Sequence, residues 1–149
     1  RLMLFLKELP SRQMVDGYAD QFADVDVDRV LDALRLMRRA SLLIRELEAY
    51  FARHDLSQLR FLMMILIDRE PERNCLAASE IAERLDVSRP VVTRTLQGLE
   101  RAGLIAISEN SEDARSRNVT LTLSGKAKLD EVLPGYFAIL HRPDPAADK

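Results

Sequence analysis

The chain has 149 residues, 47% of them hydrophobic and 31% charged, a length that fits one globular domain with a sizeable apolar core. Its single cysteine excludes a disulfide-stapled secreted scaffold, and its longest apolar run, Phe61–Ile67, is too short to span a membrane. We therefore expect a cytoplasmic protein without a membrane partner, and the net charge of −2 leaves any binding of nucleic acid to a local basic patch.

Residues 1–28 are interpreted as an N-terminal helical appendage. A first short amphipathic helix is predicted to end at Pro10, which cannot continue a helical ladder, and its apolar residues are Leu2, Phe5, Leu6 and Leu9. Ser11 is a predicted N-cap of a second short helix, whose apolar side carries Met14, Val15, Tyr18 and Phe22. Aspartates recur between Asp16 and Asp32, and we interpret them as an acidic helix start and a solvated linker.

A long amphipathic helix is predicted from Asp28 to near His54. Its apolar positions are three and four residues apart, at Val30, Leu34, Met37, Ser41, Ile44, Leu47 and Phe51. Its arginine side is interpreted as a solvated face, with a site for an anion or an acidic ligand as the alternative: Arg35, Arg38, Arg39 and Arg45. Ser57 then caps a helix from Gln58 to about Arg69, whose seven consecutive apolar residues predict burial on nearly all sides.

The next segment has the pattern of a short helix followed by a tight turn. Ser79 is predicted to cap a helix over Glu80–Leu85, with Ile81 and Leu85 pointing inward and the small Ala82 allowing close helix contact. Asp86 and Val87 are predicted to form the turn, with the valine side chain filling the gap between two helices.

A longer helix is predicted after the turn. Ser88 is its expected N-cap, Pro90 lies in its first turn, and it runs to about Arg101, with Val92, Leu96 and Leu99 inward. Gly103 supplies a left-handed stop. Helix, short turn and longer helix together predict a helix-turn-helix, whose second helix enters the DNA major groove by its N-terminal end.

The exposed side of this second helix has chemistry suited to DNA. Arg89 and Arg94 can bind phosphates or guanine, and three polar side chains can donate to phosphates or base edges: Thr93, Thr95 and Gln97. A helix N-terminus adds its own affinity for a phosphate.

Two strands are predicted to follow, over Leu104–Ser108 and Asn118–Leu123. The polar loop between them, Glu109–Arg117, contains Asp113, Arg115 and Arg117, and a long arginine at its tip suits the narrow minor groove of DNA. The predicted fold class is therefore mainly α (α+β), a winged helix-turn-helix domain with long dimerisation helices.

These motifs, in this order and spacing, resemble the MarR family of bacterial transcription regulators. The matching segments are E-I-A-E-R-L at 80–85, S-R-P-V-V-T-R at 88–94, L-E-R-A-G-L-I at 99–105, D-A-R at 113–115 and L-T-L-S-G at 121–125. The resemblance implies a homodimer that binds a pseudo-palindromic DNA operator, usually as a repressor. Many such proteins release DNA on binding a small phenolic or acidic effector.

The resemblance also implies roles for individual residues. Arg115 matches the wing arginine that enters the minor groove, and Asp113 matches the acid that steadies it. Five residues fall where the family's recognition helix meets bases and phosphates: Ser88, Arg89, Pro90, Thr93 and Arg94. Gln97 and Arg117 complete the predicted DNA-binding set. An effector pocket is expected between the long helix and the helix-turn-helix, near Met37, Ser41, Tyr50 and Arg60.

The predicted organisation has four parts. They are an appendage (1–28), a first dimerisation helix (29–56), a DNA-binding domain (57–123), and a C-terminal dimerisation helix with its tail (124–149). The family's last helix usually continues beyond the position of His141, whereas Pro143 follows here. We therefore expect residues 1–24 to be helical and to cover apolar surface at the dimer interface, against the long helix and the Leu129–Leu140 helix of either subunit.

Other classes of function have little support in the sequence. No nucleotide-binding loop and no cluster at metal-ligand spacing is present, and His54 and His141 each lie at a predicted helix end, so we expect no enzyme, metal or cofactor. Cys75 is interpreted as a small apolar residue rather than a redox sensor. The alternative function is a winged-helix protein-interaction module. Such a module would not need arginines at the tip of its wing.

Overall fold

The structure is a computed structural model that describes residues 8–70, 75–109 and 117–143. It is mostly helical with one small antiparallel sheet, as the sequence predicts. The chain divides into two compact units, residues 1–48 and 49–149, and the boundary falls inside a long helix.

The first unit begins with helix α1 (Arg12–Ala19), and Ser11 caps it as predicted. The Ser11 hydroxyl accepts a hydrogen bond from the Met14 backbone N–H at 3.3 Å. A 2.7 Å ion pair joins Arg12 to Asp28. Only Val15 of the predicted apolar side is buried, because Met14, Tyr18 and Phe22 are 60%, 63% and 57% exposed. The helix predicted over Leu2–Leu9 lies mainly outside the described residues.

Helix α2 (Val27–Arg53) confirms the long helix, with ends within one residue of those predicted. Leu31, Ser41 and Leu47 are buried along it. Met37 was predicted on the apolar side and is instead 47% exposed, and further apolar side chains are exposed on the same helix: Leu36, Leu42 and Leu43. The apolar surface of α2 is therefore wider than one chain covers.

In the second unit, aromatic rings join the end of α2 to two other helices. Helix α3 (Gln58–Asp68) begins at Ser57, whose hydroxyl accepts from the Arg60 backbone N–H at 3.1 Å. The Phe61 ring lies 4.5 Å from the Phe51 ring and 4.6 Å from the Tyr136 ring, centroid to centroid. All seven residues of the run Phe61–Ile67 are buried or half-buried, as predicted. This cluster of aromatic rings is part of the core of the second unit.

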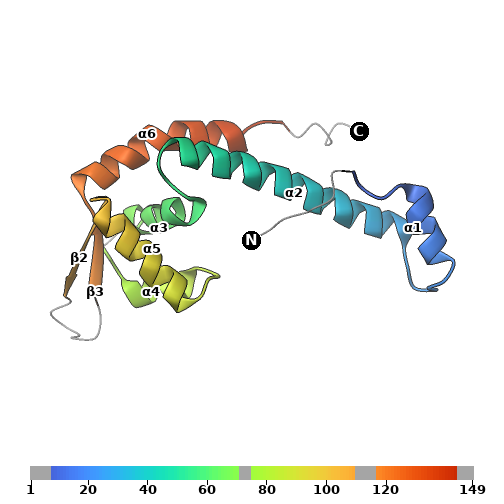
Figure 1. Ribbon diagram of the computed structural model, residues 1–149, viewed down its shortest axis with the longest axis horizontal. Coiled ribbons are helices and arrows are strands. Elements are labelled where there is room, and N and C mark those ends of the chain that lie inside the picture. The colour runs from blue at the N-terminus through green and yellow to red at the C-terminus, as the bar shows by residue number, and fades with distance from the viewer. Residues whose placement is uncertain (1–7, 71–74, 110–116, 144–149) are drawn as a thin grey trace. The chain divides into compact units, whose positions relative to one another are not determined.

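Three short strands form one antiparallel sheet in the order β1-β3-β2. They are β1 (Leu76–Ala77), β2 (Ile105–Glu109) and β3 (Arg117–Leu121). Figure 1 shows β2 and β3 side by side, with β3 leading into the last helix. The second strand was predicted to continue to Leu123, which is wrong, because Thr122 instead caps helix α6. Strand β1 was not predicted, since two residues are too few to show a pattern.

Helix α6 (Leu123–Leu140) is fastened to the rest of the unit at its first turn. The Thr122 hydroxyl accepts from the Gly125 N–H at 3.0 Å and donates to the Gly103 carbonyl at 2.6 Å. Gly125 is needed there because a Cβ on it would overlap the Leu104 carbonyl oxygen. Farther along, the Tyr50 hydroxyl donates to the Val132 carbonyl at 2.7 Å, and its ring leaves no space for a Cβ on Gly135.

Candidate nucleic-acid interface

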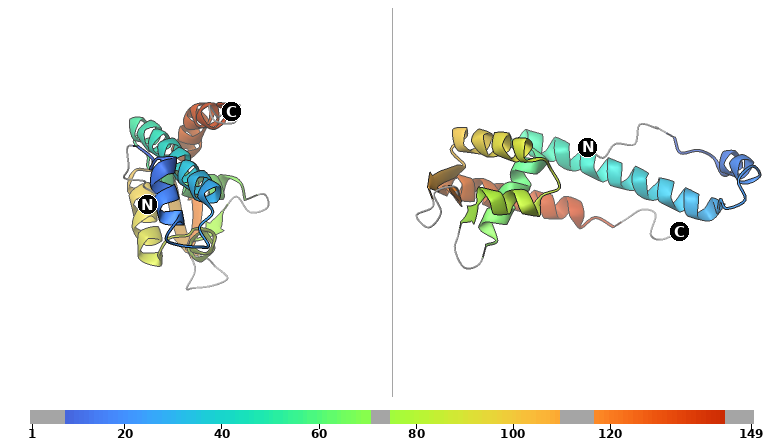
Figure 2. Two further views of the ribbon diagram at one scale, coloured as in Figure 1. Left: turned by 90° about the vertical axis from the view of Figure 1, so that its right-hand side faces the viewer. Right: turned by 90° about the horizontal axis from the view of Figure 1, so that it is seen from below.

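Helix α4 (Ala78–Arg84) and helix α5 (Arg89–Arg101) form the predicted helix-turn-helix (Figure 2). The predicted start of α4 is wrong. Ala77 rather than Ser79 occupies the N-cap position, without a side-chain hydrogen bond. Ala77 is also the last residue of β1 and pairs with Asn118 of β3, so the helix begins directly where the strand ends.

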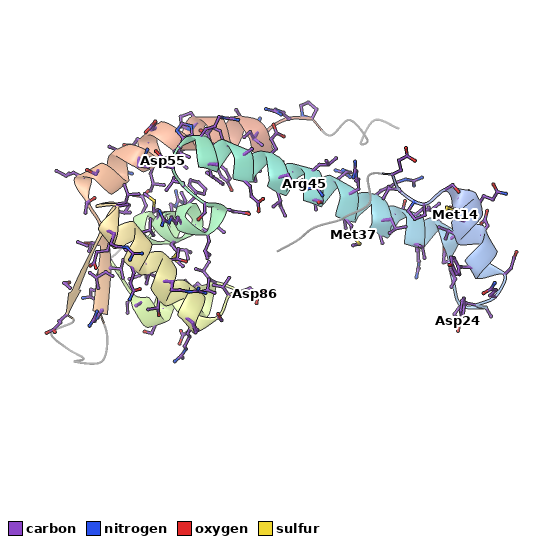
Figure 3. The ribbon with its side chains drawn as sticks, viewed as in Figure 1. Met14, Asp24, Met37, Arg45, Asp55 and Asp86 are labelled. Atoms are coloured by element: carbon purple, nitrogen blue, oxygen red, sulfur yellow. The ribbon has the colours of Figure 1, made fainter. Side chains whose placement is uncertain are left out.

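The turn between α4 and α5 also departs from the prediction. Figure 3 labels Asp86 in this turn. Val87 does not fill a gap between the helices, because its side chain is 38% exposed. Ile81 of α4 is fully buried, whereas Leu85 is only half-buried at the helix end. The α4 side of this contact therefore depends mainly on Ile81.

Helix α5 has the predicted bounds and inward side. Val92, Leu96 and Leu99 are at most 4% exposed. Ser88 is at the N-cap position, but its side chain makes no capping hydrogen bond. Pro90 lies in the first turn, and Gly103 ends the segment with a φ of 74°, in the left-handed region that favours glycine.

The outward side of α5 holds the predicted DNA-binding residues together. All six that belong to this segment are exposed: Ser88, Arg89, Pro90, Thr93, Arg94 and Gln97. Within the described part of the chain, neither Arg89 nor Arg94 has an ion-pair partner. Because the helix N-terminus adds partial positive charge, this surface favours an anionic partner.

Two threonines of α5 use their hydroxyls within the helix. Thr93 donates to the Arg89 carbonyl at 3.0 Å, and Thr95 donates to the Val91 carbonyl at 2.7 Å. Thr95 is also half-buried, so it is a poorer candidate for DNA contact than its exposed neighbours. Thr93 is exposed and its hydroxyl oxygen still has acceptor capacity.

One cation on this surface was missed by the sequence analysis. Arg101 is exposed and lies seven residues after Arg94, which places both on the same side of the helix. Helical periodicity could have found it, but its place in the last turn also suits a partner of the helix dipole.

Both strands of the hairpin next to α5 extend one residue farther toward the connection than predicted. Glu109 and Arg117 were assigned to the loop, but they face each other across β2 and β3. Because Arg117 is paired in the sheet, it lies at the base of the connection rather than at its tip. Its side chain is exposed. Asp113 and Arg115, the predicted tip residues, lie outside the described residues.

The four residues of the expected effector pocket fall in different units. Met37 and Ser41 belong to the first, and Tyr50 and Arg60 to the second. The Tyr50 hydroxyl is already bonded to the Val132 carbonyl. Arg60 is half-buried, and its guanidinium lies against Gly98 of α5.

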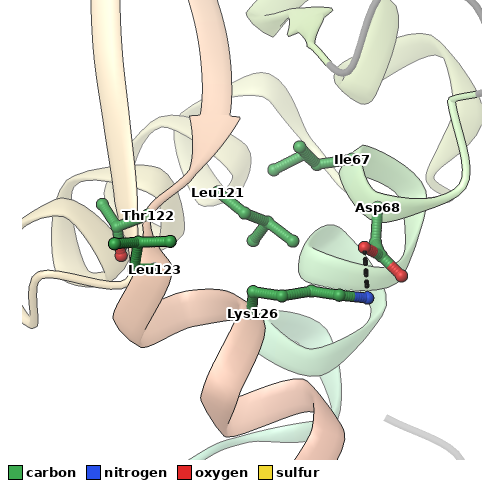
Figure 4. A pocket seen from close by; sticks show the side chains of 6 residues that line it. All are labelled: Ile67, Asp68, Leu121, Thr122, Leu123 and Lys126. Atoms are coloured by element: carbon green, nitrogen blue, oxygen red, sulfur yellow. Dashed lines mark hydrogen bonds and ion pairs between the residues drawn. The ribbon is translucent and has the colours of Figure 1, made fainter.

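A separate cleft of about 360 Å³ lies where α3, β3 and α6 meet (Figure 4). Its lining residues are Ile67, Asp68, Leu121, Thr122, Leu123 and Lys126. Lys126 donates to Asp68 at 3.0 Å, and this hydrogen bond raises the pKa of the lysine ammonium. The Thr122 hydroxyl is bonded as well. The polar groups of the cleft thus make hydrogen bonds within the protein, and the bond between Lys126 and Asp68 joins α6 to α3.

Among the residues that the structure describes, no group of histidine, cysteine, aspartate or glutamate side chains could hold a metal ion, and no helix is long and apolar enough to cross a membrane. Arg35 pairs with Asp32 at 3.3 Å, and the other arginines of that side of α2 also have interactions: Arg38, Arg39 and Arg45. Cys75 is a half-buried free thiol just before β1.

Comparisons with known proteins agree with this arrangement. A family model described as MarR family matches residues 54–116. The HTH-type transcriptional repressor YetL of Bacillus subtilis (strain 168) is 33% identical over 134 residues, which cover 89% of this chain and 79% of that protein.

Solved structures share the fold. The MarR family regulator AbsC of Streptomyces coelicolor matches with a TM-score of 0.71 and 20% identity, covering 79% of this chain and 78% of that one. The transcriptional regulator MOSR of M. tuberculosis, solved in complex with DNA, matches with a TM-score of 0.59 and 25% identity over 72% of this chain and 76% of that one.

Proposed function

Because the chain belongs to the MarR family of transcriptional regulators, we propose that it is a repressor that binds a pseudo-palindromic DNA operator as a homodimer. The observation that carries this proposal is the outward side of α5, where exposed Arg89 and Arg94 have no ion-pair partner among the described residues. In this role α5 enters the major groove with its N-terminal half. The relatives include a protein named as a repressor and a regulator solved with DNA, which supports the same reading.

Each residue of the predicted DNA-binding set has a proposed task. Arg89 and Arg94 bind phosphates or guanine edges, and Gln97 reads a base edge or donates to a phosphate. Ser88 and the first-turn N–H groups contact a phosphate, and Pro90 shapes the helix start without presenting an N–H. Thr93 contacts bases or phosphates, Arg115 enters the minor groove, Asp113 steadies Arg115, and Arg117 adds charge at the base of the hairpin.

The proposed homodimer is supported by apolar surface that one chain leaves uncovered. Phe137 and Leu140 near the end of α6 are 56% and 42% exposed. Apolar side chains on α1, the following loop and α2 are exposed as well: Met14, Tyr18, Phe22, Leu36, Met37, Leu42 and Leu43. Exposed apolar area of this extent usually marks an interface. In the dimer, the two α5 helices lie about one helical turn of DNA apart.

An effector is the second part of the proposal. A small phenolic or acidic molecule binds the chain at Arg60 in the second unit and releases the DNA. Arg60 carries the argument for an acidic group, because its cation has no carboxylate partner within the described part of the chain. As a regulator of transcription, the protein acts in the bacterial cytoplasm.

The test begins with selection of binding sequences from a random duplex library. Fluorescence anisotropy then compares the selected duplex with a random duplex at two salt concentrations. We expect tighter binding to the selected duplex, palindromic half-sites in it, and a steep loss of affinity with salt, because phosphate contacts release counterions. A chain that binds no duplex at either salt concentration would instead fit the protein-interaction module.

A further inference from the structure

Gly98 is buried in the middle of α5. The end of the Arg60 side chain occupies the space that a side chain at this position would need. A Cβ on Gly98 would lie 2.5 Å from Nη2 of Arg60, 3.2 Å from Cζ and 3.6 Å from Nε. The guanidinium therefore lies directly against the backbone of α5 at this position. Glycine in a helix interior is unfavourable relative to alanine, so its presence here has a packing reason.

The Arg60 side chain extends from a well-anchored point. Its backbone N–H is held by the Ser57 hydroxyl at 3.1 Å, in the first turn of α3. The next residue, Phe61, is 1% exposed and stacks on Phe51. The backbone of Arg60 is thus tied to the aromatic core of the unit, and the guanidinium at the end of its side chain contacts α5.

This contact is one of packing rather than of charge. No carboxylate among the described residues pairs with Arg60. A guanidinium is planar and weakly hydrated, so it packs flat against a backbone, which the compact and strongly hydrated ammonium of lysine does not do. A glycine is the one residue that leaves the backbone open to such a group.

We propose that Arg60 is a positioning residue for DNA recognition, acting through Gly98. Its guanidinium sets the distance between α3 and α5 and the rotation of α5 about its axis. Arg94 and Gln97 lie within four residues of Gly98, so a change at this contact moves both side chains relative to the groove. The inference rests on the proposed function, in which α5 reads DNA.

A double-mutant cycle tests the contact itself, without DNA. In the parent protein, Gly98→Ala is expected to raise Tm little or not at all, because the new Cβ must displace the end of the Arg60 side chain and this offsets the gain in helix propensity. In the Arg60→Ala background the same substitution is expected to raise Tm, because the space is open and alanine favours the helix. An equal shift in Tm in both backgrounds would overturn the proposal.

DNA binding tests the positioning role. Arg60→Ala is expected to reduce the ratio of affinities for selected and random duplexes by about tenfold, the scale of coupling between residues in contact. Arg60→Lys is expected to reduce it similarly, whereas a simple phosphate contact would be largely retained by lysine. Arg69→Ala removes an exposed charge from the other end of α3 and is the matched control.

The outcomes distinguish failure of the positioning role of Arg60 from failure of the proposed DNA-binding function. If the Tm values are coupled but the affinity ratio stays unchanged, Arg60 is structural only and the positioning role is wrong. If the parent binds no duplex, the proposed function fails, while the difference between the two Tm shifts still reports on the contact. A cooperative thermal transition in each single variant and in the double variant shows that they fold.

Discussion

Single residues at the proposed DNA surface differ in what they contribute to folding. Arg89, Arg94 and Gln97 are exposed, whereas Gly98 and Gly103 meet steric and conformational demands of the fold. Substitution of the first group is expected to change DNA affinity with little effect on stability. Substitution of the second group is expected to act through the fold.

The first prediction at this scale concerns Arg115, the proposed wing arginine. Arg115→Ala is expected to weaken binding to the selected duplex by about 1–3 kcal/mol, the scale of a good groove contact, with Tm nearly unchanged. Asp113→Ala is expected to weaken binding less, because the arginine remains. Both are measured by anisotropy. Arg29→Ala, at a side chain that is 89% exposed in the first unit, is the control for loss of one charge. Unchanged affinity in Arg115→Ala would show that the assignment by resemblance is wrong.

Gly103 provides a prediction about backbone conformation. Gly103→Ala is expected to cost roughly 1–2 kcal/mol, because alanine in the left-handed region is strained although no atom lies within 4 Å of the added Cβ. Gly17→Ala is the matched control, since its site in α1 is equally open and its φ is not positive. We expect the control to stabilise α1 by about 0.5–1 kcal/mol. Urea denaturation followed by circular dichroism measures both, and equal effects would contradict the conformational explanation.

Among the elements, the junction of α5, the hairpin and α6 depends on the Thr122 hydroxyl. This one group caps α6 through the Gly125 N–H and holds the Gly103 carbonyl. The Thr122 hydroxyl therefore joins the segment after α5 to the start of α6, beside the 3.1 Å backbone hydrogen bond from the Thr122 N–H to the Leu104 carbonyl. A winged helix needs such a junction, because its hairpin must keep a constant position beside the recognition helix.

The corresponding prediction is that Thr122→Val destabilises the protein by about 1–2 kcal/mol, since a cap and a second hydrogen bond are lost with no change of shape. The free energy of unfolding is measured in urea at one protein concentration. Thr120→Val is the control, because its hydroxyl lies 3.5 Å from the Ala106 carbonyl and contributes little. Equal destabilisation by both variants would mean that the hydroxyl of Thr122 has no special part in the junction.

For the whole molecule, the question is what covers its exposed apolar side chains. Met14, Tyr18 and Phe22 on the first unit and Phe137 and Leu140 on the second are all exposed in one chain. A second copy of the chain is the proposed cover. Since binding stabilises the folded state, a homodimer also makes Tm depend on protein concentration.

We expect deletion of residues 1–24 to weaken the dimer and, with it, DNA affinity. Mass in solution, measured by light scattering over a range of concentrations, reports the first effect, and anisotropy with the selected duplex reports the second. Met14→Ser/Tyr18→Ser in the full chain is the finer variant, because it removes apolar area and keeps the Ser11 cap. A truncated protein that remains a stable dimer with unchanged affinity would leave the appendage without the proposed role.

The sequence by itself determined the features that depend on neighbouring residues. Ser11 and Ser57 cap the helices predicted for them, α2 and α5 have the predicted bounds, and Gly103 has the left-handed conformation. Helical spacing also predicted the exposed side of α5 with Arg89, Thr93, Arg94 and Gln97, whereas the family resemblance added Ser88 and Pro90 to the DNA-binding set. Caps, helical periodicity and turn conformations act over a few residues, so the sequence carries their signal where no distant contact overrides it, as at Ser11 and Ser57.

Only the tertiary structure decided the features that depend on residues far apart in the chain. Strand β1 exists because Leu76 and Ala77 pair with β3, and this pairing moves the N-cap of α4 from Ser79 to Ala77. Val87 is exposed, and Arg117 pairs with Glu109 in the sheet instead of lying in the loop. The contact between Arg60 and Gly98 joins α3 to α5 through two residues that are 38 positions apart along the chain. No local pattern encodes such a contact, because its energy depends on packing that exists only after the chain has folded.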